Sequence, residues 1–294
     1  MTDLASAGLR PARARAIPRG SDPGTAGDVR RGQAILVVLA GAVRGRLGPW
    51  LVPLALLAAW QAAARAGLIA PSVLPAPTDV LAAGWKLILN AQLLDNIAVS
   101  ARRAFSGFLV GGSLAFALGL ANGLSRLSER LTDTTIQMLR NIPNLALIPL
   151  VILWFGIEED AKLFLTSLGV FFPIYINTFH GVRTVDPQLV EMGRSYGMGR
   201  FDLFRRIILP GALPSIFVGV RYALGIMWLT LIVAETIAAN SGIGYMAMNA
   251  REFMLVDVVV LAILIYALLG KLADSAVRVL ERLCLAWHPA FQRS

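Results

Sequence analysis

Long apolar stretches alternate with short polar and basic segments along most of this chain. Six of the apolar stretches reach the length that a helix needs to cross about 30 Å of hydrocarbon. They are predicted at residues 48–66, 104–124, 136–156, 161–182, 211–239 and 255–277. The pattern therefore predicts an all-α polytopic membrane protein with about six transmembrane helices.

The segments around these spans suggest how the chain is divided. Residues 1–47 comprise an Arg-rich tail and a ten-residue apolar stretch at 34–43, which is too short to span and is expected at the membrane interface. Residues 48–92 are expected to hold the first span and an outer segment with an amphipathic helix at 80–89. The transmembrane core is expected at 93–277 and a cytoplasmic end at 278–294.

The basic residues predict the orientation of the chain. Most of the 27 Lys and Arg residues fall in the N-terminal tail, the second-to-third loop, the fourth-to-fifth loop and the C-terminal end. By the positive-inside rule, these segments and both termini are cytoplasmic. The basic residues form no aromatic-interleaved stripe of the kind that binds nucleic acid. The tail either contacts anionic membrane lipid or has no role, and the sequence leaves both alternatives open.

Composition excludes several classes of protein. With 56% apolar and 15% charged residues, the chain has too little charge for the surface of a soluble domain. Its single cysteine, Cys284, cannot form an internal disulfide, and its two histidines are too far apart to suggest a metal site. Since no catalytic Ser/His/Asp set or carboxylate pair is evident, we expect no catalytic residues, no metal and no cofactor on this chain.

Small residues recur every fourth position in the second span. They are Gly107, Gly111, Ala115, Gly119 and Gly123, and they form a smooth stripe along one helical face. Such stripes let helix backbones approach closely in lipid. Tight helix packing is therefore the preferred interpretation, although membrane helices are also enriched in glycine generally.

Proline and asparagine interrupt the third span. Asn141, Pro143, Asn144 and Pro149 lie within an otherwise apolar stretch. Proline frees carbonyl groups from the helical ladder, and asparagine can satisfy them or line a water-filled path. A simple kink and a path remain equally open at this point.

The fourth-to-fifth loop has the pattern of a structured hairpin. Asp186 is suited to cap a helix, Pro187 to occupy its first turn and Gly197 to end it. A second short helix is expected at about 201–208, ending at Pro210. Either this hairpin is a docking element for a cytoplasmic protein or it is a solvated connection.

The same loop resembles the signature loop of permease subunits in bacterial ABC importers. That family's pattern is Glu-Ala-Ala, three residues, Gly, nine residues, Ile, any residue, Leu, Pro; here Met192 and Gly193 replace the two alanines. The resemblance implies a coupling helix within 186–198 that docks on an ATPase, with the two glycines allowing close approach. The residues assigned to this coupling are Glu191, Met192, Gly193, Arg194, Gly197, Ile207, Leu209 and Pro210.

Further stretches are similar to the sulfonate, taurine and nitrate group of these permeases, and especially to permeases of aliphatic sulfonate importers. They lie at 138–143, 147–157, 172–178, 227–236 and 241–246, and the resemblance extends over about residues 48–290. It implies the type I ABC importer permease fold in the bacterial inner membrane. It also implies a homodimer, two copies of a cytoplasmic ATPase and an external substrate-binding protein.

The resemblance implies that this permease imports aliphatic sulfonates. Taurine, nitrate or another small anion is the alternative within the family, and an ATP-independent secondary transporter is the alternative from another class. A phosphate-binding loop is not evident, because Gly270-Lys271 is followed by Leu272 and Ile265 stands where the first glycine should be. The chain is therefore expected not to be an enzyme, with ATP and Mg bound by the partner ATPase.

Polar residues within the spans are candidates for the translocation path. They are Asn141, Asn177, Thr178, Arg221, Trp228 and Glu235. Arg221 is suited to attract a sulfonate, to brace helices or to reach water, and all three roles stay open. Glu235 is expected to order the turn at 240–245. Asp274, Arg278, Glu281 and Arg282 are expected to form surface ion pairs on the last helix.

Overall fold

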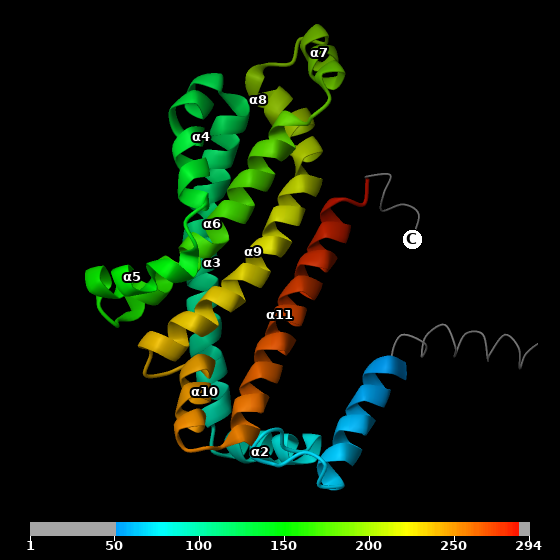
Figure 1. Cartoon of the computed structure of the whole chain (residues 1–294). Helices are drawn as coiled ribbons and strands as arrows, with labels where there is room; N and C mark the ends of the chain where they lie inside the picture. The colour runs from blue at the N-terminus through cyan, green and yellow to red at the C-terminus, as the bar shows by residue number, and fades with distance from the viewer. Residues whose placement is uncertain (1–50, 288–294) are drawn as a thin grey trace, which may run out of the picture. The chain divides into compact units, whose positions relative to one another are not determined.

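The computed structural model describes residues 51–287, and its regular elements there are all helical (Figure 1). Four helices are long and apolar enough to cross a membrane. They are α3 (Gln92–Leu124), α6 (Glu159–Arg183), the continuous helix Arg200–Ile237 and α11 (Val256–Cys284). The predicted all-α membrane fold is thus confirmed for the described residues.

The third predicted span is not one straight helix. α4 (Arg126–Arg140) is followed by a 3₁₀ turn, η1 (Asn144–Leu147), and by α5 (Ile148–Phe155). The two parts meet at an angle of 85°. Pro143 caps the 3₁₀ turn and Pro149 lies in the first turn of α5, so neither residue can continue the helical ladder. The bend corrects the single helix predicted at 136–156, and α4 also begins ten residues earlier.

One other predicted boundary differs from the structure. The first apolar helix is described over Leu51–Arg65 and ends within one residue of the predicted 48–66, while residues 48–50 lie outside the described part of the chain. α2 (Pro77–Leu89) matches the expected amphipathic helix. α3 begins at Gln92 instead of 104, because the polar residues before the apolar stretch continue the same helix. The left-handed Ala91, with a φ of 60°, separates α2 from α3.

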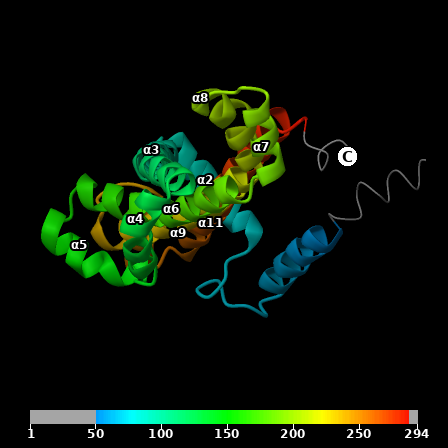
Figure 2. The same cartoon turned by 90° about the horizontal axis from the view of Figure 1, so that it is seen from above.

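The central layer is formed by α3, α6 and α9 (Leu209–Ala238), which lie next to one another when the bundle is viewed from above (Figure 2). The stripe of small residues on α3 lies against α6. A Cβ atom added at Gly107 would lie 2.6 Å from Thr166 Cγ2, and one at Gly111 would overlap the Ser167 carbonyl. Side chains at these positions would force the two helices apart.

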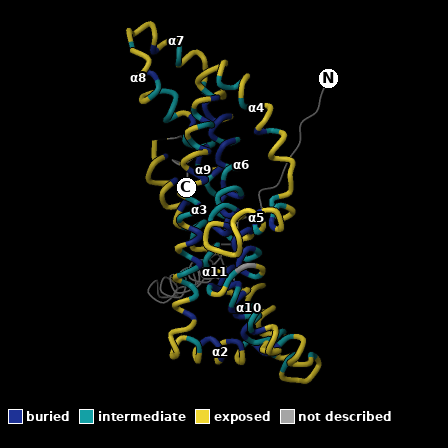
Figure 3. The backbone as a smooth tube through the Cα atoms, turned by 90° about the vertical axis from the view of Figure 1, so that its left-hand side faces the viewer, coloured by how far each residue is buried: buried dark blue, intermediate teal, exposed yellow. Residues whose placement is uncertain are grey.

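α6 and α9 approach each other in the same way. A Cβ atom at Gly181 would lie 2.9 Å from Ser215 Cβ, and one at Gly219 would lie 2.6 Å from Asn177 Cβ. The small residues thus join three helices into one layer. Figure 3 shows buried and half-buried stretches along α6 and α9 in this layer. In lipid, this close packing supplies the stability that apolar burial supplies in water.

A second core lies at the end of the bundle that carries α2. There α2 and α10 (Ile243–Glu252) pack on the first turns of α11 through Val80, Ile243, Met246 and Leu261. The hairpin of α7 (Pro187–Ser195) and α8 (Arg200–Leu203) lies at the opposite end (Figure 1). One end of the bundle is therefore closed by the packed helices α2 and α10, and the other carries the α7–α8 hairpin.

The described residues from 60 onward form one compact unit, and the sites described below lie in it. The expected interfacial stretch at 34–43 and the rest of the Arg-rich tail lie outside the described residues.

Candidate functional site

The α7 hairpin is held together by local interactions that the sequence predicts. The Asp186 carboxylate accepts a hydrogen bond of 2.8 Å from the backbone N–H of Gln188, and Pro187 occupies the first turn. Gly197 ends the helix in the left-handed region, with a φ of 77°. The backbone N–H of Met198 then donates to the Gly193 carbonyl at 3.1 Å. These bonds satisfy both ends of a nine-residue helix that would be marginal alone.

Gly193 faces its own chain, not an open surface. A Cβ atom there would lie 2.6 Å from Ile207 Cδ1 and 2.8 Å from Leu203 Cδ1. Gly193 thus lets α7 pack on the start of the following helix, and the expected close approach of a partner at this glycine stays a prediction. A Cβ atom added at Gly197 would have no neighbour within 4 Å among the described residues, so the space beside this glycine is open.

The outer surface of α7 is apolar at helical spacing. Leu189, Met192 and Tyr196 are exposed, and Tyr196 retains 79% of its accessible surface. Three exposed apolar side chains at i, i+3 and i+7 are typical of a helix that docks in a groove. Glu191 and Arg194 lie beside them and are exposed as well.

The second short helix does not end at Pro210, contrary to expectation. α8 passes through a π-helical turn, η2 (Phe204–Ile208), directly into α9, so that one helix runs from Arg200 to Ile237. Pro210 lacks an N–H group and its ring crowds the preceding turn. A wider π turn just before it absorbs that crowding without breaking the helix. Ile207 lies in this turn, and Leu209 and Pro210 begin α9.

Glu235, near the other end of the same helix, is the centre of a buried polar cluster. Its carboxylate accepts hydrogen bonds from Ser100 Oγ, Tyr266 OH and the backbone N–H of Gly244, at 2.8 to 2.9 Å. Arg103 NH1 donates to it at 2.8 Å. The glutamate orders the α9–α10 turn, as expected, but it also joins α9 to α3 and α11.

Arg103 uses its whole guanidinium group in this cluster. Nε and NH2 donate to the Glu159 carboxylate at 2.7 and 2.6 Å, and NH1 also donates to the Ser241 carbonyl at 2.6 Å. NH2 makes a further bond to Ser241 Oγ. Arg103 retains only 5% exposure, whereas Glu159 retains 53%. The pairing offsets the cost of a charge that is buried at the end of the bundle that carries α10.

Sequence reasoning missed Arg103, Ser100 and Tyr266. A signal was present, since Arg103 lies four residues before Gly107 and so continues the register of the small-residue stripe. A buried glutamate within a span also requires a partner.

The six candidate residues of the translocation path do not line one shared cavity in the described chain. Asn177 donates to the carbonyl of Pro173 in its own helix, and Thr178 is buried against Gly119. Asn141 is exposed at the end of α4, and Trp228 packs edge-on against Tyr266. Glu235 is enclosed in its cluster.

Arg221 braces two helices. Its Nε donates to Asp274 Oδ1 of α11 at 3.1 Å, and its NH1 lies 3.8 Å from Glu281 Oε2. Arg278 forms the expected pair with Asp274, at 2.8 Å. Because two carboxylates face Arg221, the geometry favours the bracing role over that of a free anion site.

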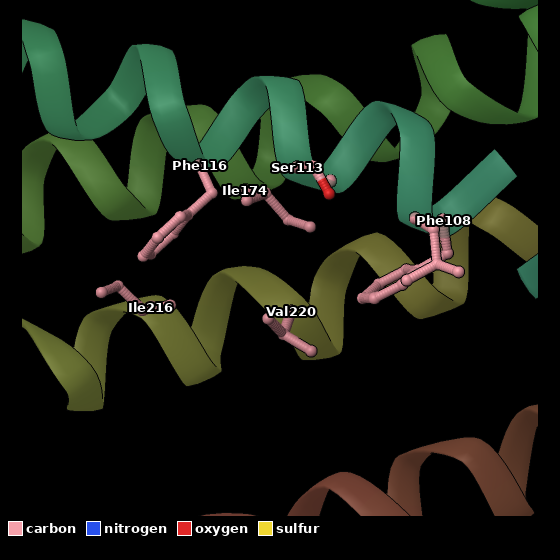
Figure 4. A pocket seen from close by; sticks show the side chains of 8 residues that line it. Phe108, Ser113, Phe116, Ile174, Ile216 and Val220 are labelled. Atoms are coloured by element: carbon pink, nitrogen blue, oxygen red, sulfur yellow. The ribbon is translucent and has the colours of Figure 1, made fainter. Parts of the chain in front are cut away.

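An apolar groove of about 230 Å³ opens between α3, α6 and α9. Phe108, Phe116, Ile174, Ile216 and Val220 point into it, and Ser113 is the one hydroxyl among its described lining residues (Figure 4). A second cavity of about 460 Å³ continues from Phe108 and Val220 toward α11. Surfaces of this composition suit lipid or another helix better than an anion.

Comparison with known proteins gives the family. Residues 108–284 match the family described as the binding-protein-dependent transport system inner membrane component. The chain is 61% identical to the putative aliphatic sulfonates transport permease protein SsuC of Escherichia coli strain K12, over 84% of this chain and 94% of that protein. It is 36% identical to the taurine transport system permease protein TauC of the same strain, over 81% of this chain and 88% of that protein.

The fold agrees with a solved structure described as an amino acid ABC transporter with histidines. The TM-score is 0.52 at 17% identity, and the match covers 67% of this chain and 96% of that one. This likeness concerns the fold alone. The family match covers more than half of the chain, and the sequence relatives extend over most of it. The chain therefore belongs to the family of inner-membrane components of binding-protein-dependent ABC importers.

Proposed function

We propose that this chain is the permease subunit of an ATP-driven importer of aliphatic sulfonates. The observation that carries the proposal is the 61% identity, over 84% of the chain, to the Escherichia coli permease named for that substrate class. Identity to the taurine permease is much lower, at 36%. Taurine therefore ranks second as the cargo.

The proposed partners are two copies of a cytoplasmic ATPase, an external substrate-binding protein and a second copy of this chain. ATP and Mg would bind the ATPase, and this chain would contribute the docking surface. The exposed row of Leu189, Met192 and Tyr196 on α7 supports this assignment, because it is apolar, helical and at the end opposite α2.

A physical route connects the proposed docking surface to the far end of the bundle. α7 packs through Gly193 on Leu203 and Ile207, which belong to the continuous helix Arg200–Ile237. That helix carries Glu235, whose carboxylate holds the α9–α10 turn, α3 and α11. If the ATPase displaces α7, the continuous helix Arg200–Ile237 would therefore move with it and would shift the Glu235 cluster at its other end.

In the proposed cycle, ATP binding closes the ATPase dimer and draws the two α7 helices together. The path then opens outward to cargo from the binding protein, and hydrolysis returns it to the inward state. The Arg221–Asp274 pair and the Glu235 cluster would hold α9 and α11 together as they move.

Uptake in sulfur-starved cells tests the proposed cargo. Labelled ethanesulfonate, taurine and nitrate are supplied to cells with and without this chain. Loss of ethanesulfonate uptake alone supports the proposal. Unchanged ethanesulfonate uptake with loss of taurine or nitrate uptake would contradict the cargo and keep the family.

Co-purification tests the docking surface independently. Met192→Arg places a charge in the apolar row of α7 and should release the ATPase. Gly199→Ala is the matched control in the same hairpin, because its added Cβ meets nothing within 4 Å. An ATPase that stays bound to the Met192→Arg protein would refute docking through this surface.

A further inference from the structure

A basic pocket of about 500 Å³ lies between α4 and α6, at the end of the bundle that carries α7. Its lining residues are Arg126, Glu129, Arg130, Asp133, Thr134 and Arg183. We propose that this pocket binds the headgroup of an anionic phospholipid from the cytoplasmic leaflet. The proposal does not depend on which cargo the importer carries.

The charges in the pocket are not balanced. Three arginines face two acids, of which Glu129 pairs with Arg183 and Asp133 accepts a hydrogen bond of 2.9 Å from Tyr175 OH. Arg126 and Arg130 are exposed and form no hydrogen bond or ion pair with any described residue. Two guanidinium groups, one helical turn apart, therefore remain available for an anion.

The walls of the pocket are fixed by a polar network among three helices. Asn122 of α3 donates to Thr132 Oγ1 at 2.8 Å and to Tyr175 OH at 2.7 Å. Arg183 also lies over the Phe179 ring, 5.6 Å from its centroid. The arginines of α4 are thus presented from a rigid frame, which lowers the entropic cost of binding a ligand.

The position of the pocket, at the ends of two apolar spans, suits a lipid headgroup. Arg126 and Arg130 follow the apolar stretch of α3 within two helical turns, and Arg183 follows that of α6 directly. All three arginines thus lie where these spans end on the α7 side, which is the cytoplasmic side in the proposed importer. Basic pockets between helices at this boundary bind anionic headgroups.

An apolar ridge adjoins the pocket along α4. Leu127, Leu131 and Met138 lie within about 40° of one another around the helix axis and are all largely exposed. Arg126 and Arg130 lie on the adjacent face. A basic pocket beside an exposed apolar ridge suits a phospholipid better than a free anion, because the pocket can bind the phosphate while the acyl chains lie along the ridge.

Lipid binding to the purified permease–ATPase complex tests the proposal. Phosphatidylglycerol and phosphatidylcholine are titrated separately, and bound lipid is counted by native mass spectrometry. We expect wild type to prefer phosphatidylglycerol, and the double variant Arg126→Gln with Arg130→Gln to bind it about tenfold more weakly. Arg205→Gln removes another exposed arginine near this end, one with no ion pair among residues 51–287, and should retain the wild-type affinity.

Four results would overturn the proposal. The first is equal phosphatidylglycerol binding by the double variant and Arg205→Gln, and the second is equal binding of the two lipids by wild type. The third is an efficient disulfide between two copies carrying Leu131→Cys in lipid vesicles, which would assign the ridge to a copy interface. Displacement of the lipid by millimolar ethanesulfonate or inorganic phosphate would likewise show a free-anion site. The double variant Arg126→Lys with Arg130→Lys keeps the charge and should retain the lipid preference.

Discussion

The buried pair of Arg103 and Glu235 provides a quantitative test of how the end of the bundle that carries α10 is held together. Arg103→Leu removes the ion pairs with Glu235 and Glu159 and leaves the Glu235 carboxylate fully buried. Removal of one partner from a buried pair costs about 3 to 5 kcal/mol, because the other charge stays desolvated. We therefore expect Arg103→Leu to lower the free energy of unfolding by about that amount.

Arg102→Leu is the matched control, because Arg102 is exposed and forms no ion pair among the described residues. Its expected cost is about 0 to 1 kcal/mol. The double variant Arg103→Leu with Glu235→Leu removes both charges, so it should be more stable than Arg103→Leu alone. The coupling energy from this double-mutant cycle should be about 1 to 3 kcal/mol.

The assay is reversible unfolding of the purified chain by dodecyl sulfate in mixed micelles, followed by circular dichroism. The reasoning would be refuted if Arg103→Leu lowered the free energy of unfolding no more than Arg102→Leu does. It would equally be refuted if the double variant lost the sum of the two single losses, because the two charges would then be independent.

Three glycine substitutions give further predictions, each measured by thermal unfolding in detergent. Gly111→Ala should destabilise the chain by about 1 to 3 kcal/mol, because its methyl group would overlap the Ser167 carbonyl. Gly225→Ala should be neutral or stabilising by up to about 1 kcal/mol, since nothing lies within 4 Å and alanine favours the helix. Gly242→Ala should destabilise strongly, because Gly242 has a φ of 106° and its added Cβ would overlap the Glu235 carboxylate. Equal melting temperatures for the first two variants would contradict the close packing of α3 on α6.

The spanning helices could largely be predicted from the sequence, because their signal is local. Apolar length identifies α3, α6, α9 and α11, and proline marks the break between α4 and α5. The cap at Asp186 and the left-handed turn at Gly197 are also local features, and the structure contains both. The size of the bend and the polar start of α3 depend on packing with other helices and could not be read from hydropathy.

The sites depended more on tertiary contacts. The sequence marks Glu235 as costly within a span but does not identify its partners, because Ser100, Arg103 and Tyr266 come from distant segments. Gly193 is a related case. Its spacing indicated a close approach, and only the fold shows that the approaching side chains belong to Leu203 and Ile207.

Transport by the reconstituted complex is the most direct test of the central claim. The chain, its ATPase and the external binding protein are assembled in lipid vesicles, and uptake of labelled ethanesulfonate is measured. The account predicts uptake that requires ATP and the binding protein, that stops with a hydrolysis-deficient ATPase and that is lost with Met192→Arg. Uptake driven by an ion gradient without ATP would contradict it and would favour a secondary transporter.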